Sequence, residues 1–177
     1  VDIDDPAFES LLVGRKVKVL LSDVDLLRWR HDLIEDRNRL AALYAAAKQV
    51  DAARDAKLTA LREVITHKFQ HPTNPGNKKI IIFTAFADTA VYLYEQLSAW
   101  AKTDLGIESA LVTGSGRNQS SLPHLRKDLA SILTSFSPRS KERPADLAHE
   151  GELDSLIATD CISEGQNLQD CDWLINY

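Results

Sequence analysis

The C-terminal part of the chain carries residue types that could hold phosphate and sugar groups. Thr159 and Asp160 close an apolar run, and Gly165 and Asn167 follow in a polar turn. Loops after parallel strands form the ligand sites of α/β proteins, because the sheet fixes where they start. A glycine lets the backbone approach a phosphate closely, and an asparagine amide can bond a sugar hydroxyl. These residues favour binding, and none of them is a candidate catalytic acid or base.

The familiar catalytic and metal-binding signatures are absent from the sequence. It contains no G-x-x-x-x-G-K-[ST] loop to cradle a triphosphate, no G-x-S-x-G turn and no H-E-x-x-H pair. Gly114 and Gly116 follow an apolar run as in a dinucleotide-binding turn, but Gln119 stands where the third glycine belongs. His67 and His71 are four residues apart and lack a third ligand. We therefore predict no catalytic residue and no metal site in this chain.

Four apolar segments predict the strands of one sheet. They cover residues 80–86, 108–113, 154–160 and 172–177. Apolar residues at helical spacing predict helices over 88–102 and 122–136. Strands of this buried type, alternating with helices, predict an α/β fold with a parallel sheet and right-handed crossovers. Residues 137–152 are polar and hold two prolines, so we expect a disordered surface loop there.

The chain before residue 78 has a different character. Helical periodicity begins near Ser22 and extends to Val50, and a second apolar stripe covers residues 58–69. The segment 71–77 combines prolines, asparagines and a glycine, which predicts a loop. The sequence thus predicts an N-terminal helical segment and linker over 1–77, followed by an α/β lobe over 78–177.

Composition excludes several classes of protein. The 177 residues are 44% hydrophobic and 27% charged, which is typical of a folded domain. The net charge of −5 gives no global basic field that would attract nucleic acid. The sequence has no apolar run long enough to span a membrane and no signal peptide, and its two cysteines predict reduced thiols in a cytoplasmic protein. Because it begins with Val and contains no Met, we expect an excised fragment or a processed segment.

The C-terminal lobe resembles a known family of motor proteins. The pattern A-T-D-x-x-S-E-G-x-N-L-Q-D-x-D-x-x-I-N-Y over 158–177 is similar to motif V of superfamily-two helicases, nearest their Swi/Snf-like bacterial branch. Residues 78–97 resemble motif IV, Val112-Thr113-Gly114 resembles the strand-end T-G, and Arg126 with Phe136 resembles the stretch before motif V. The four motifs occur in the family order across 78–177.

The resemblance implies a second RecA-like lobe, whose fold is related to P-loop NTPases, from an ATP-dependent helicase or translocase. It implies that one group of residues contacts the nucleic-acid backbone: Thr84, Thr113, Gly114, Thr159 and Asp160. It places a second group at the interlobe ATP cleft: Glu164, Gly165 and Asn167. ATP and Mg²⁺ would serve the parent protein, with nucleic acid (DNA rather than RNA) and the first RecA-like lobe as partners and no membrane.

The departures from the family pattern set further expectations. The arginine-rich motif VI would lie just past Tyr177, and the first lobe with its Walker A loop before Val1. Because an arginine finger alone can be worth about 10³–10⁵ in rate, we expect no ATPase activity and no cofactor for residues 1–177 by themselves.

Two other functions stay open beside the motor lobe. One is a degenerate, non-enzymatic lobe that docks another protein through its N-terminal helices, since the alanine-rich stretch 40–49 could pack closely on a helix. The other is a nucleotide-cofactor binder at Gly114 and Gly116. The motor hypothesis requires that Thr84, Thr113 and Thr159 converge on one rim of the sheet.

Overall fold

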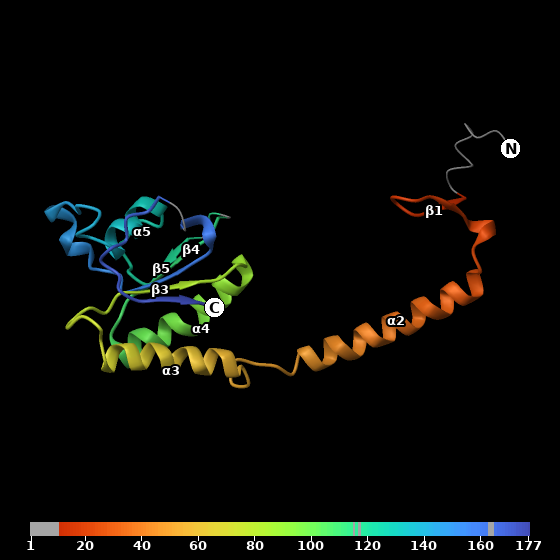
Figure 1. The fold of residues 1–177 in the computed structure, drawn as a ribbon, viewed down its shortest axis with the longest axis horizontal. Helices are drawn as coiled ribbons and strands as arrows, with labels where there is room; N and C mark the ends of the chain where they lie inside the picture. The colour runs from red at the N-terminus through yellow and green to blue at the C-terminus, as the bar shows by residue number, and fades with distance from the viewer. Residues whose placement is uncertain (1–10, 115, 117, 163–164) are drawn as a thin grey trace, which may run out of the picture. The chain divides into compact units, whose positions relative to one another are not determined.

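The computed structural model describes residues 11–114, 116, 118–162 and 165–177. It contains two compact units, one ending at Arg54 and one running from Asp55 to Tyr177 (Figure 1). The second unit begins at Asp55, and the predicted lobe over 78–177 lies within it.

The first unit consists of a small hairpin and one long helix. Strands β1 (Leu12–Val13) and β2 (Val19–Leu20) pair antiparallel, and the short 3₁₀ turn η1 (Leu21–Asp23) follows. Helix α2 (Leu26–Ala47) begins after Asp25, whose carboxylate accepts a hydrogen bond from the Arg28 amide at 3.0 Å. This is an ordinary N-cap, which satisfies one of the free N–H groups of the first turn. None of the 22 residues of α2, all of which the structure describes, is buried.

The second unit is built on a five-stranded sheet of order β5-β4-β6-β3-β7. Its strands are β3 (Ile80–Phe83), β4 (Ser109–Val112), β5 (Gln119–Ser120), β6 (Ser155–Ala158) and β7 (Leu174–Asn176). Every pair is parallel except β4 with β5. The predicted α/β fold and the four predicted strands are confirmed, and the sheet is mixed and mostly parallel. The antiparallel edge strand β5 was missed because two polar residues carry no periodicity.

Helices cover both faces of this sheet. Helix α4 (Ala87–Trp100) continues into the π-helical turn η2 (Ala101–Leu105) and packs against β4 and β6. Helix α5 (Leu129–Phe136) contributes to the core on the other face, among a cluster that includes Phe136, Leu156 and Ala158. Alternate residues of each strand point to opposite faces, so continuous apolar runs are required for strands that are covered on both sides.

Helix α5 is shorter than the sequence predicted. The expected helix began at Leu122, but residues 122–128 are not helical. Asp128 caps the helix by accepting from the Ser131 amide at 2.9 Å. Leu122 and Leu125 are nevertheless buried in the core, and their spacing of three residues imitated a helical stripe. Arg126, between the buried leucines and the cap, contacts the Asp128 carboxylate at 3.3 Å.

Helix α3 (Ala56–Gln70) belongs to the second unit. It buries Leu58, Leu61 and Ile65. Two hydrogen bonds join α3 and its N-cap to α4: Tyr92 Oη donates to the Asp55 carboxylate at 2.9 Å, and Arg62 Nη2 donates to the Gln96 carbonyl at 2.8 Å. Figure 1 shows the two helices side by side.

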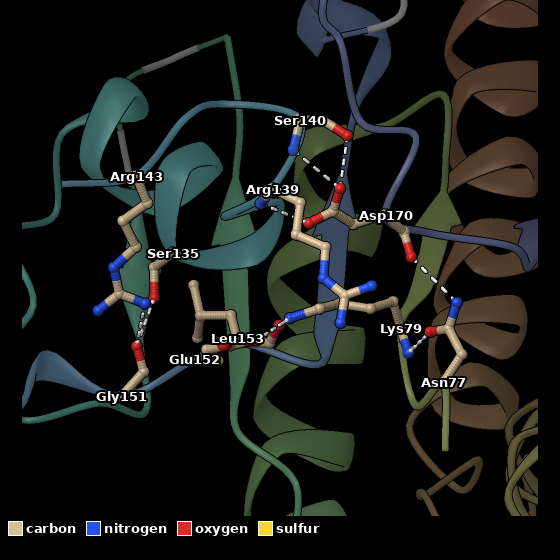
Figure 2. A network of polar contacts seen from close by, with 10 residues as sticks. All are labelled: Asn77, Lys79, Ser135, Arg139, Ser140, Arg143, Gly151, Glu152, Leu153 and Asp170. Atoms are coloured by element: carbon tan, nitrogen blue, oxygen red, sulfur yellow. Dashed lines mark hydrogen bonds and ion pairs between the residues drawn. The ribbon is translucent and has the colours of Figure 1, made fainter. Parts of the chain in front are cut away.

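The segment 137–152 differs from the disordered loop that we expected. It contains the 3₁₀ helix η3 (Ala145–Glu150), and Arg143 Nη1 donates to the Gly151 carbonyl at 2.7 Å (Figure 2). Another 3₁₀ turn, η4 (Asp160–Ile162), follows β6. Among the helices that the structure describes, none combines the length and apolar character needed to cross a bilayer.

Candidate functional site

Thr84, Thr113 and Thr159 lie on one rim of the sheet, as the motor hypothesis requires. In the sheet register Phe83 and Val112 both pair with Ala158, and each of these residues is followed by one of the threonines. The Thr84 amide donates to the Ala158 carbonyl at 3.0 Å, and the Thr159 amide donates to the Val112 carbonyl at 3.2 Å. Thr84, Thr159 and Thr113 therefore lie side by side at the carboxyl edge of β3, β6 and β4.

The accessible groups of this rim are not the threonines themselves. Thr84, Thr113 and Thr159 are only 6%, 4% and 5% exposed. The hydroxyl of Thr159 donates to Cys161 Sγ at 3.4 Å, and the Thr113 amide donates to Asn118 Oδ1 at 3.3 Å. Amides of all three threonines are thus used by the protein, so the exposed part of the rim is formed by the residues that come next.

Those next residues include two of the predicted contacts, Gly114 and Asp160, and both are exposed. Gly114 presents an accessible stretch of backbone after β4. A carboxylate such as Asp160 repels phosphate oxygens, so it does not serve as a phosphate ligand in its ionised form. The five residues predicted to contact nucleic acid therefore lie at one edge of the sheet. Gly114 and Asp160 are exposed there, and the three threonines are buried.

The turn after β4 does not fit a dinucleotide site. Such a site needs a helix to start directly after the glycines, because the helix N-terminus binds the pyrophosphate. Here the short strand β5 follows Gly116 instead. The alternative of a nucleotide cofactor at Gly114 and Gly116 is therefore not supported by the local architecture.

An open groove of about 680 Å³ lies beside β7. Residues 165–169 and 171–174 line it, together with Ile81 of β3. Gly165 and Asn167, two of the three residues assigned to the ATP cleft, both belong to this lining. The third, Glu164, lies outside the described residues.

Gly165 has a φ of 70°, with no atom within 4 Å of where a Cβ would stand. Backbone conformation rather than space therefore favours glycine there.

The groove suits neutral polar groups better than a triphosphate. Its described lining provides the side-chain amides of Gln166, Asn167 and Gln169 beside the ring of Trp173, and it includes no Lys or Arg. Amides can bond sugar hydroxyls or a base edge, whereas phosphates require cationic or backbone N–H partners. Nor do the described residues contain a cluster of three His, Cys, Asp or Glu placed to hold a metal ion. The described lining therefore offers partners for hydroxyl and amide groups and no cationic side chain for a phosphate.

A buried lysine holds the far end of the loop that lines the groove. Lys68 of α3 is completely buried, and its ammonium group donates to the Asp172 carboxylate and to the Asn77 carbonyl, the latter at 3.1 Å. Asn74 Nδ2 also donates to Asp172, at 2.8 Å. Although burial alone would raise it, the hydrogen bonds from Lys68 and Asn74 lower the pKa of the Asp172 carboxyl.

Sequence reasoning missed Lys68, although a signal was present. The apolar stripe of α3 runs through Leu58, Leu61 and Ile65, and the next position on that stripe is Lys68. A lysine on a buried face requires an anionic or carbonyl partner. The pattern could therefore have indicated a buried ion pair, but not which acid supplies it.

A second hollow lies where β3 and β6 begin, at the sheet edge opposite the three threonines. Its volume is about 960 Å³, and its lining includes Lys79, Glu152, Asp154 and Asp170. Lys79 Nζ donates to Glu152 at 2.9 Å and to the Leu153 carbonyl at 2.8 Å (Figure 2). Burial raises the pKa of the Asp154 carboxyl, and the nearby Lys79 opposes this shift.

Comparison with known proteins assigns no family. No family model matches the chain, and no curated protein matches it in sequence. The chain is an α/β domain with a mostly parallel five-stranded sheet and an N-terminal helical region.

Proposed function

We propose that this chain is the second RecA-like lobe of a superfamily-two helicase-type motor, near the Swi/Snf-like branch. The proposal rests on the location of three residues. Residues from three separate motif-like segments, Thr84, Thr113 and Thr159, lie side by side at one sheet edge. The loop that leaves the same edge after β6 supplies Gly165 and Asn167 to a groove.

In this role the rim holds one nucleic-acid strand by its backbone. Backbone contacts position a strand without reading its sequence, which suits a motor that must move along any sequence. The strand first contacts the exposed backbone at Gly114. The proposal includes that binding then exposes the hydroxyls of the three threonines, which are 4–6% exposed in the free chain. Because the described part of the rim carries Asp160 and the chain has a net charge of −5, we expect weak affinity.

The groove would contribute to an ATP site shared with the first lobe. Gly165 and Asn167 would contact the sugar, while the first lobe would supply the phosphate cradle and the Mg²⁺ ligands. In the two-lobed parent, ATP binding and hydrolysis would drive closure and opening of the cleft between the lobes. ATPase activity is accordingly expected of the two-lobed parent and not of this chain alone.

The test is binding of a fluorescein-labelled single-stranded DNA, followed by fluorescence anisotropy. We expect weak binding that falls steeply between about 50 and about 200 mM NaCl, because backbone contacts release counterions. The triple variant Thr84→Val, Thr113→Val, Thr159→Val should reduce affinity, because valine keeps the shape and removes the hydroxyl.

The matched control is Thr134→Val, which removes a hydroxyl from α5, away from the rim. It should bind as the unmodified chain does. If the DNA does not bind at low salt, or if the triple variant binds as tightly as the control, the motor assignment is refuted.

One observation favours the docking module as the second candidate. Helix α2 has 22 residues and buries none of them within its own unit. A helix in a protein ordinarily gains its stability from packing of an apolar face. Because α2 has no such packing within its unit, it is a candidate surface for binding another protein. This candidate is preferred if the chain fails to bind single-stranded DNA at low salt.

A further inference from the structure

We infer that the segment 137–152 is a brace that positions the loop 165–170 along the groove. The inference rests on the proposed function only in treating that groove as part of the nucleotide cleft. The contacts that support it come from the described residues of the free chain. It assigns a role to a segment that the sequence treated as a disordered insertion.

The central contact is the Asp170 carboxylate. It accepts hydrogen bonds from the backbone amides of Arg139 and Ser140, at 2.8 and 2.9 Å, and from the Ser140 hydroxyl (Figure 2). Hydrogen bonds to an ionised group are stronger than neutral ones. Although burial alone would raise it, the bonds from Ser140 and Arg139 lower the pKa of the Asp170 carboxyl. Two consecutive backbone amides therefore bind the ionised Asp170 carboxylate and hold that end of the loop in place.

Two further contacts hold the loop nearer the groove. The Ser140 carbonyl accepts from Asn167 Nδ2 at 3.2 Å, and Lys141 Nζ donates to Gln166 Oε1 at 2.9 Å. Gln166 and Asn167 both line the groove. Three successive residues, 139–141, thus fix a groove wall that lies 25 to 31 positions later in the chain.

The brace is itself anchored, so it can resist displacement. Arg143 Nη1 donates to the Gly151 carbonyl at 2.7 Å, and Ser135 Oγ donates to the same carbonyl at 3.2 Å. At the end of the segment Glu152 pairs with Lys79, a residue only 8% exposed, at 2.9 Å. In Figure 2 the Ser135 contact joins the segment to α5, and the Glu152–Lys79 pair joins it to the start of β3.

The loop also separates two hollows. Gln169 lines both the groove and the cavity where β3 and β6 begin, while Asp170 and Ser140 line the cavity alone. Asn77 Nδ2 donates to the Asp170 carbonyl at 3.0 Å from the cavity side. A change in the brace therefore changes the groove wall directly, and Asp170 is the positioning residue for Asn167.

The test is amide hydrogen exchange on the full chain without DNA or nucleotide, using the variant Asp170→Ala. Loss of this acceptor should speed exchange by about 10- to 100-fold at two amides: Ser140, which donates to the Asp170 carboxylate, and Cys171, which donates to the Leu168 carbonyl of the loop. Exchange at the core amides of β4 should stay unchanged. The side-chain amide resonance of Asn167 should shift, which a general loss of stability would not produce.

The matched control is Arg139→Ala, because it removes an exposed side chain and keeps the backbone amide that Asp170 accepts. It should leave exchange at the Ser140 and Cys171 amides as in the unmodified chain. Should Asp170→Ala unfold the domain, Ser140→Ala removes only the hydroxyl bond and should give a smaller, local increase.

Unchanged exchange at the Ser140 and Cys171 amides in Asp170→Ala, or an equal increase in Arg139→Ala, overturns the brace. Neither result bears on DNA binding, because no ligand is present. Conversely, a chain that fails to bind DNA can still show the exchange pattern, so the two proposals fail separately.

Discussion

The ion pair between Lys68 and Asp172 gives the sharpest prediction for stability. Lys68 is fully buried, whereas the Asp172 side chain keeps 13% of its surface exposed and a second donor in Asn74. Removing one partner of a buried pair costs about 3–5 kcal/mol, since the other charge is left uncompensated. We expect unequal costs for the two partners because their surroundings differ.

Asp172→Ala should be the more damaging change. It leaves a buried ammonium group with one carbonyl partner, at Asn77, so its cost should approach 5 kcal/mol. Lys68→Met keeps the apolar volume and leaves Asp172 with Asn74 and some solvent, so its cost should be about 3 kcal/mol. The double variant should recover part of the loss, because no charge remains buried.

Urea unfolding followed by circular dichroism measures these differences in free energy of unfolding. The pH dependence provides the control. Because the pKa of Asp172 is lowered in the folded state, its stabilisation is present above the unfolded value of about 3.9 and is lost as the pH falls through the folded pKa. Asp172→Ala should lose less stability than the unmodified chain over that acidic range. A cost of Lys68→Met equal to or above that of Asp172→Ala would refute this account of the pair.

Three further predictions follow from single residues. Gly151 has φ 86° and ψ −178°, and a Cβ there would stand 3.1 Å from Leu122, so Gly151→Ala should cost about 1–3 kcal/mol in thermal or urea unfolding. Burial raises the pKa of Asp154, so Asp154→Asn should increase the free energy of unfolding at pH 7, and the gain should vanish in acid where the carboxyl is protonated in both states. Cys161 is exposed, whereas burial raises the pKa of Cys171, so a thiol reagent at pH 8 should modify Cys161 first; equal rates would contradict the described burial.

Local sequence determined the elements of the second unit. The run from Ile80 to Phe83 is apolar and β-branched, so it becomes a strand covered on both faces. Positions directly after such strands reach the sheet edge, which is why Thr84, Thr113 and Thr159 could be expected on one rim. These conclusions need only the spacing of neighbouring residues, a property that the chain carries before it folds.

Tertiary structure alone decided the partners of these elements. Strand β6 lies between β3 and β4, although it follows both in sequence, because parallel pairing depends on crossovers and not on chain order. Lys68 could be recognised as unusual, but the acid that neutralises it lies 104 residues away. The polar composition of 137–152 suggested solvent exposure, yet its amides and side chains bond residues 166–170. Hydrogen bonds and ion pairs act over a few ångströms, and sequence separation does not reveal which groups the folded chain brings within that distance.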